Sequence, residues 1–163
     1  MTRGEFTMMH TKGIQSDIED FMRAVGQGLP ATPQSADPAT LQLRIDLITE
    51  EFDEIIYALT LLQSLDPLHT PGQTSKATEL ALLAEVADGI ADLVYVAIGT
   101  ASALGIDMEP VWEEVQRSNM AKVSGPIRED GKRLKPEGWS PPQIERVIRE
   151  QVAEADFADR PIG

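Results

Sequence analysis

Three glutamates crowd one short apolar segment of the chain. Residues 48–56 read ITEEFDEII, and within them Glu50, Glu51 and Glu54 form the pattern E-E-x-x-E. Like charges three and four residues apart on a helix repel each other. Because isoleucine and phenylalanine flank these carboxylates, either solvent screens that repulsion or a cation removes it. The first chemistry to consider is therefore metal binding through oxygen.

A second acidic row follows about thirty residues later. In EVADGIAD, Glu85, Asp88 and Asp92 have the spacing i, i+3 and i+7, which places them on one stripe of a helix. Helical bundles build metal sites from inward-facing carboxylates on neighbouring helices. Mg²⁺ and Mn²⁺ prefer oxygen ligands, and the chain has no cysteine to compete. Together the two rows predict a Mg²⁺ or Mn²⁺ site, whereas each row alone could be a solvated helix face.

A basic segment lies downstream of both acidic rows. It holds six of the fourteen lysines and arginines: Arg117, Lys122, Arg128, Lys132, Arg133 and Lys135. Metal ions and basic side chains together can neutralise a polyphosphate. The segment is therefore a candidate phosphate-binding loop, and the alternative is a solvated loop that offsets an acidic body.

Composition limits the possible partners. The chain has 163 residues and a net charge of -13. A surface this acidic argues against non-specific binding to nucleic acid or to an anionic membrane. We find no apolar run long enough to cross a bilayer and no secretory leader, so we expect a cytoplasmic protein. Residues 1–13 are expected to be a tag or disordered, with a native start at Met8 or Met9, and residues 14–163 to form one domain.

The elements that must position these residues are helices. Hydrophobic periodicity predicts helices over about 16–27, 38–65, 76–104, 108–122 and 142–155, and no β-strand. Ser16 and Asp107 are expected N-caps, Pro38 opens the second helix, and Gly105 ends the third. We therefore predict an all-α bundle with two long antiparallel central helices.

Apolar stripes on the long helices should form the core. The stripes expected to face inward are Leu41, Ile45, Ile48, Phe52, Ile55 and Leu59 on the first, and Leu80, Leu83, Val86, Ile90, Leu93, Val94 and Ile98 on the second. The apolar surface left over includes Leu59, Leu61, Leu62 and Val96. It predicts a homodimer with the active site near the interface, although a tetramer stays open.

The acidic motifs and the tail resemble a known family. EEFDE and EVAD, together with SNMAK (118–122) and KPEGW (135–139), resemble the all-α nucleoside triphosphate pyrophosphohydrolases. These comprise MazG-like proteins, dimeric dUTPases and phosphoribosyl-ATP pyrophosphohydrolase. The tail is most similar to the phosphoribosyl-ATP pyrophosphohydrolase-like subgroup, some of which act as MazG-type dUTPases. The resemblance extends from about Ile18 to Ile148.

This resemblance implies roles for individual residues. The implied ligands of Mg²⁺ or Mn²⁺, about two or three ions per site, are Glu50, Glu51, Glu54, Glu85 and Asp88. Either Glu50 or Glu51 would orient or deprotonate the attacking water. The implied substrate-binding residues are Asn119, Lys122, Lys132 and Lys135, with Asp92 and Tyr95 extending the second acidic stripe.

The sequence says less about which residues recognise the base than about which residues bind metal. Among the aromatic residues Phe21 is our first choice for stacking on a base, and Gln15 or Asn119 could pair with a uracil edge. The expected reaction converts a (d)NTP into a (d)NMP and pyrophosphate, with dUTP as the leading substrate. The alternatives are phosphoribosyl-ATP as substrate, stepwise release of phosphate, and a non-catalytic metal-binding helical dimer.

Overall fold

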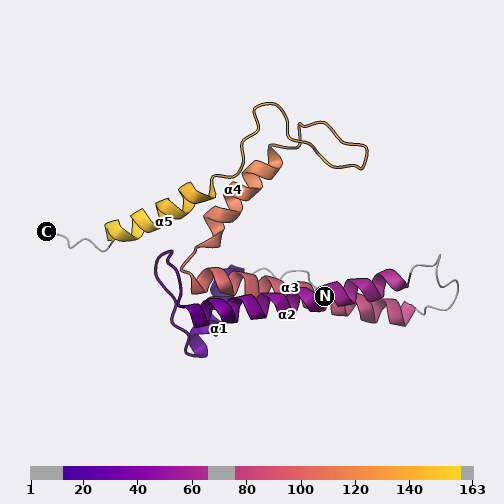
Figure 1. Cartoon of the computed structure of the whole chain (residues 1–163), viewed down its shortest axis with the longest axis horizontal. Helices are drawn as coiled ribbons and strands as arrows, with labels where there is room; N and C mark the ends of the chain where they lie inside the picture. Colours follow the sequence, from indigo (N-terminus) through magenta and orange to yellow (C-terminus); the bar gives the residue numbers. More distant parts are fainter. Residues whose placement is uncertain (1–12, 66–75, 159–163) are drawn as a thin grey trace, which may run out of the picture. The chain divides into compact units, whose positions relative to one another are not determined.

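The computed structural model describes residues 13–65 and 76–158, and these residues form five helices. The helices are α1 (Ile14–Ala24), α2 (Pro38–Ser64), α3 (Lys76–Ala103), α4 (Met108–Met120) and α5 (Ile144–Ala158) (Figure 1). The chain divides into two compact units, one of residues 1–27 and 35–100 and the other of residues 28–34 and 101–163. Residues 1–12 lie outside the described part, so a tag there, and a single domain over 14–163, stay predictions.

The prediction of an all-α fold is confirmed. The described segments contain no strand, only one isolated antiparallel bridge between Ile127 and Arg133. The two long central helices were predicted to within a residue at each end. No helix in these segments is both long and apolar enough to span a membrane.

Local chemistry explains why the helices begin and end where they do. The Asp37 side chain accepts hydrogen bonds from the Ala39 and Thr40 backbone N–H groups, at 3.0 Å each, ahead of Pro38. Asp107 caps α4 as expected, by accepting from the Glu109 N–H at 2.9 Å. Gly105 has φ 69°, the left-handed conformation that favours glycine after a helix.

The expected N-cap at Ser16 is wrong. Helix α1 begins at Ile14, with Gly13 as its N-cap and no side chain capping it. The capping-box pattern of Ser16 and Glu19 therefore falls inside the helix. Glu19 instead accepts a hydrogen bond from Gln15 and pairs with Arg23, four residues away on either side.

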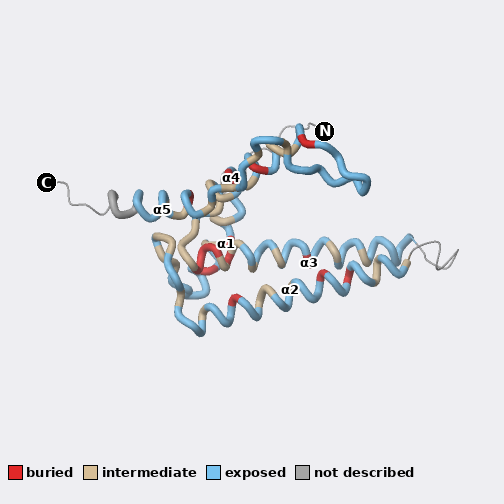
Figure 2. Tube along the Cα trace, turned by 45° about the horizontal axis from the view of Figure 1, so that its top comes forward, coloured by how far each residue is buried: buried red, intermediate tan, exposed pale blue. Residues whose placement is uncertain are grey.

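Helices α2 and α3 run side by side in antiparallel directions (Figures 1 and 2). A Cβ built on Gly89 would lie 3.4 Å from the Cα of Ile55, and one built on Gly99 would lie 3.7 Å from the Arg44 guanidinium. Gly89 comes before Gly99 along α3, whereas its partner Ile55 comes after Arg44 along α2. The two helices are therefore antiparallel. Glycine at position 89 lets the backbone of α3 approach the backbone of α2 closely, and glycine at position 99 leaves room for the Arg44 side chain.

The contact seam of α2 differs from the predicted apolar stripe. Its less exposed positions recur as Arg44, Ile48, Glu51, Ile55, Ala58 and Leu62, while Leu41, Ile45, Phe52 and Leu59 are exposed. On α3 the less exposed positions include Leu82, Val86, Gly89, Leu93 and Val96, while Leu80, Leu83, Ile90 and Val94 are exposed. Each predicted stripe covers two adjacent apolar sides of its helix. The side that packs against the other long helix is less exposed, and the other side is exposed.

The second unit is held together by hydrogen bonds as well as by packing. Helix α4 packs against α5, and the Glu114 carboxylate, buried in α4, accepts a hydrogen bond from the Gln143 N–H at 2.7 Å. The Trp139 indole N–H donates to the Ser118 carbonyl at 2.9 Å. A hairpin-like turn separates α4 from Trp139, with Leu134 N–H donating to the Pro126 carbonyl at 2.8 Å. These bonds fix the segment that carries the basic residues.

Candidate active site

The carboxylates of both acidic rows lie along the α2–α3 pair. A cavity of about 490 Å³ is lined jointly by Glu54 of α2 and by Glu85 and Asp88 of α3, with Tyr57, Ala58, Leu61 and Gly89 completing its wall. The structure therefore brings together three of the five predicted metal ligands around one space. Tyr57 was missed by the sequence reasoning, because a tyrosine one turn from a glutamate carries no distinctive signal.

Glu51 is the half-buried member of the acidic rows and lies on the contact seam. Burial raises the pKa of its carboxyl, and the nearby carboxylates of Asp92, Glu54, Glu50 and Asp88 raise this pKa further. Four negative charges therefore act on the partly buried carboxyl of Glu51, and the protein's own groups leave this negative charge uncompensated. Asp92 has the largest charge effect on Glu51, so it belongs with the acidic rows.

This donor set suits a hard divalent cation. The groups are carboxylate oxygens on two adjacent rigid helices, and the chain contains no thiol. The side chains that the structure describes do not, however, gather three or more such ligands around a single point. Repulsion keeps carboxylates apart in the absence of a counter-charge. Convergence of Glu50, Glu51, Glu54, Glu85 and Asp88 on one ion therefore stays a prediction.

Three of the predicted substrate-binding residues meet around Trp139 in the second unit. The ammonium groups of Lys135 and Lys122 lie 4.1 Å and 5.4 Å from the centroid of an indole ring. Lys122 also donates to the Asn119 side-chain oxygen at 2.8 Å. Cation–π contacts hold both ammonium groups near one ring while leaving their N–H groups able to bind an anion.

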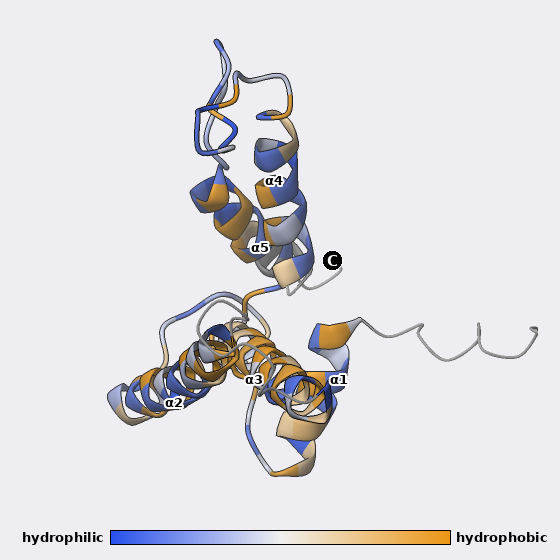
Figure 3. Cartoon of the chain, turned by 90° about the vertical axis from the view of Figure 1, so that its right-hand side faces the viewer, coloured by the Kyte–Doolittle hydropathy of each residue, from blue (hydrophilic) through white to orange (hydrophobic). Residues whose placement is uncertain are grey.

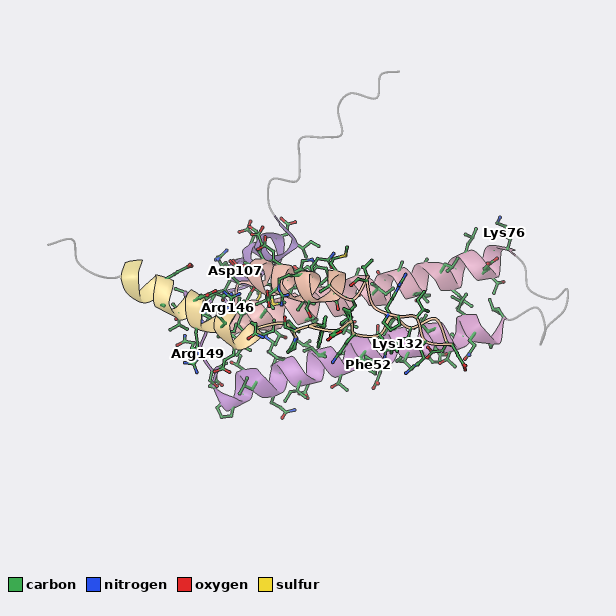
Figure 4. The ribbon with its side chains drawn as sticks, turned by 90° about the horizontal axis from the view of Figure 1, so that it is seen from above. Phe52, Lys76, Asp107, Lys132, Arg146 and Arg149 are labelled. Carbon is green, nitrogen blue, oxygen red and sulfur yellow. The ribbon has the colours of Figure 1, made fainter. Side chains whose placement is uncertain are left out.

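The arginines of the basic segment have structural partners instead. Arg117 forms a bidentate ion pair with Glu114, with both nitrogen–oxygen distances at 2.8 Å, and Arg128 pairs with Asp130. Arg133 donates to the Gly125 carbonyl at 3.0 Å. Lys132 lies on the exposed turn between α4 and α5 (Figure 4). The basic segment thus separates into arginines that shape the loop and lysines that stay available.

A second, smaller cavity lies where α1 meets the α2–α3 pair. Its volume is about 190 Å³, and its lining is mostly apolar: Ile18, Phe21, Met22, Gln27, Arg44, Leu47, Tyr95, Val96 and Gly99. Phe21 and Tyr95 meet edge to face, with ring centroids 5.9 Å apart. Both predicted aromatic substrate contacts therefore line one cavity. Gln15 is half-buried on α1 and does not line it.

Arg44 is the residue of this cavity that sequence reasoning missed. The residue is only 9% exposed, and its guanidinium donates to the Gln27 side-chain oxygen at 2.9 Å. No signal in the sequence distinguished it, because both flanks of α2 are apolar and the spacing alone does not show that Arg44 shares a seam with Ile55. An arginine on a buried seam is unusual enough to mark a site.

Comparison with known families adds an independent finding. A family described as phosphoribosyl-ATP pyrophosphohydrolase matches residues 18–119, which is more than half of the chain. The match includes both acidic rows and ends at Asn119, so Lys122, Lys132 and Lys135 lie beyond it. No curated protein matches the chain significantly.

Proposed function

Because the chain belongs to the phosphoribosyl-ATP pyrophosphohydrolase family, a family of hydrolases that act on phosphoric anhydrides, we propose that it cleaves nucleoside triphosphates to nucleoside monophosphates and pyrophosphate. The observation that carries the proposal is the cavity lined by Glu54, Glu85 and Asp88 from two neighbouring helices. A row of carboxylates on each side of one space is how helical bundles hold divalent ions against phosphates.

We propose that Mg²⁺ or Mn²⁺ is held by the five carboxylates named above, with Asp92 as a further candidate ligand. Bound ions would neutralise phosphate oxygens and acidify the attacking water. Burial, and then the neighbouring carboxylates, raise the pKa of Glu51, and a bound cation would offset both effects, which supports this assignment.

The protein's own groups account for the proton and the leaving group. Glu51, or its neighbour Glu50, accepts the proton of the water that attacks the α-phosphorus. The bond between that phosphorus and the bridging oxygen breaks, and pyrophosphate departs. Lys122 and Lys135 would bind phosphate oxygens as point charges.

Two substrates compete within this reaction. The proposed leading candidate is dUTP, supported by the similarity of the SNMAK and KPEGW segments to a subgroup that includes dUTPases. Phosphoribosyl-ATP is the second candidate, and the family's description favours it at least as strongly. Both substrates release pyrophosphate from an α-phosphate, so the proposed roles of the carboxylates are the same.

A substrate panel tests the proposal. Purified protein in Mg²⁺ would be given dUTP, the canonical nucleotides and phosphoribosyl-ATP, with products identified by phosphorus NMR, and Glu51→Gln as the control. We expect pyrophosphate as the product of at least one of them. Sequential release of inorganic phosphate would overturn the proposed reaction, and the absence of hydrolysis across the panel would overturn the proposed function.

We also propose that the protein is a homodimer that buries the exposed apolar flank of α2 against a second copy. With about 100° of rotation per residue, the carboxylates of α2 fall on one side of the contact seam and the exposed apolar residues on the other. Leu41, Ile45, Phe52, Ile56 and Leu59 are all at least 36% exposed. Figures 2 and 3 show how much of α2 and α3 is exposed and how apolar α3 is. A continuous apolar face of this kind is typical of subunit interfaces.

A further inference from the structure

Arg44 lines the smaller cavity and carries an unsatisfied donor. Its Nε is fully buried without a hydrogen-bond partner, the one such side-chain nitrogen or oxygen found in the described segments. Burial also lowers the pKa of the guanidinium, because no carboxylate compensates its charge. Leaving a buried donor unpaired costs stability, so an arginine kept here suggests that a ligand supplies the missing acceptor.

The position of the cavity indicates which part of a nucleotide it meets. Arg44, Leu47, Glu51 and Glu54 have the spacing i, i+3, i+7 and i+10, so the cavity and the carboxylates share one stripe of α2. On α3 Asp88, Asp92, Tyr95 and Gly99 have the spacing i, i+4, i+7 and i+11, which also places them on one stripe. Seven residues of helix separate Arg44 from Glu51, a rise of roughly 10 Å. One nucleoside spans a gap of this size between its base and its α-phosphate.

The walls of the cavity have the chemistry of a base pocket. Phe21 and Tyr95 offer aromatic surface, and Met22 and Val96 offer apolar contact. The polar side chains of the lining are Arg44, which can only donate, Gln27, whose oxygen already accepts from Arg44, and Tyr95, whose hydroxyl can donate or accept. A buried unpaired N–H of Arg44 and a lining without a carboxylate favour a ring edge that carries a carbonyl oxygen.

We propose that this cavity binds the nucleobase and that Arg44 selects bases with a carbonyl rather than an amino group at the edge it meets. The inference rests on the proposed nucleotide pyrophosphohydrolase activity and deepens it. A carbonyl oxygen satisfies the buried Nε–H, whereas an exocyclic amine would place a donor against a donor. Sites built around a buried polar group discriminate strongly against ligands that leave it unpaired.

The test compares nucleotide pairs that differ by this one group. We would measure kcat/KM for dUTP against dCTP and for dITP against dATP, in saturating Mg²⁺. For wild type we expect the carbonyl member of at least one pair to be favoured by about 10²-fold or more. In Arg44→Met the preference should fall to within a few-fold, and Arg44→Lys should restore little of it, because lysine lacks the planar N–H.

A stability measurement separates this role from a structural one. Arg44→Met removes a buried, unpaired charge and replaces it with an apolar side chain of similar length. We therefore expect an unchanged or higher Tm without nucleotide, whereas an arginine needed for folding would give a lower one. Arg23→Met is the matched control: Arg23 lies on the same α1–α2–α3 unit, is exposed and pairs with Glu19, and should change neither selectivity nor Tm much.

The outcomes distinguish the two proposals. Hydrolysis of no nucleotide by wild type would overturn the proposed function itself. Hydrolysis in which Arg44→Met slows all substrates equally and keeps the preference would overturn only the role of Arg44. As a readout independent of turnover, dUMP should raise the Tm of wild type more than dCMP does, and Arg44→Met should lose that difference. Equal shifts in wild type would also count against the inference.

Discussion

Gly89 on α3 lies directly against Ile55 on α2: a Cβ at Gly89 would sit 3.4 Å from both the Cα and the Cβ of Ile55. This contact lies between the two acidic rows and sets the separation of the helices that carry them. A methyl group fits at this distance, but a longer side chain does not.

Gly89→Ala should therefore be tolerated. Alanine gains up to about 1 kcal/mol of helix propensity over glycine, and its methyl makes an ordinary contact. Gly89→Leu should instead cost about 1–3 kcal/mol through overpacking and reduce activity by moving the acidic rows apart. Melting curves and turnover of both variants would check this, with Ala84→Leu on the exposed side of α3 as control. A fully active Gly89→Leu would show that helix separation does not matter.

The acidic rows should matter for rate rather than for folding. Glu51→Gln keeps the size of the side chain and removes a charge that four other carboxylates repel. We expect a loss in kcat on the order of 10²-fold or more, with an unchanged or higher Tm without metal. Mg²⁺ should raise the Tm of wild type more than that of the variant. Near-wild-type turnover in Glu51→Gln would show that the carboxylates of the EEFDE segment form only a solvated helix face and have no role in the reaction.

Lys122 is expected to act on substrate affinity. Its ammonium lies beside Trp139 and Asn119, where it could contact phosphate in both the ground and transition states. Lys122→Ala should then raise KM more than it lowers kcat. Steady-state kinetics beside Lys76→Ala, at the exposed start of α3, would measure this. A fall in kcat alone would assign Lys122 to the transition state instead.

The buried carboxylate of Glu114 should make stability depend on pH. The hydrogen bond from Arg117 and that from the Gln143 N–H lower the pKa of Glu114 to about 2 in the folded chain. Its stabilising contribution is therefore complete above its ordinary pKa and is lost as pH falls toward about 2. Glu114→Gln should have a lower Tm than wild type at pH 7, and the difference should shrink between about pH 4.5 and 2.

The matched control is Glu145→Gln on α5. Glu145 pairs with Arg149, but both side chains are exposed, so this substitution should change the Tm little at any pH. A difference between wild type and Glu114→Gln that stays constant down to pH 2 would contradict the assigned role of the carboxylate.

The proposed dimer can be tested at the exposed apolar flank of α2. Phe52 is 51% exposed in the single chain, and placing a charge there would oppose burial against a second copy. Phe52→Lys should shift the mass in light scattering from dimer toward monomer, while Asp53→Lys, on a neighbouring polar position, should not. A wild-type monomer at micromolar concentration would overturn the dimer.

The sequence by itself determined most of the secondary structure and the family. Periodicity, Pro38, Gly105 and Asp107 are local signals, and they predicted the start of α2, the end of α3 and the start of α4. The E-E-x-x-E and E-x-x-D spacings likewise depend only on helix geometry, and they placed carboxylates on common stripes. Ser16 failed as a cap because a polar residue near a helix start can equally well lie inside the first turn.

Only the tertiary structure decided which flank of each long helix faces its partner. Both flanks of α2 are apolar, so periodicity alone could not choose between Leu41 and Arg44 as the seam residue. The close approach of α3 to the α2 backbone at Gly89, and the contact of Gly99 with the Arg44 side chain, made that choice, because these contacts depend on where the glycines meet the other helices. That choice put Glu51 on the seam and buried the Arg44 guanidinium beside Phe21 and Tyr95, which no local spacing could have specified.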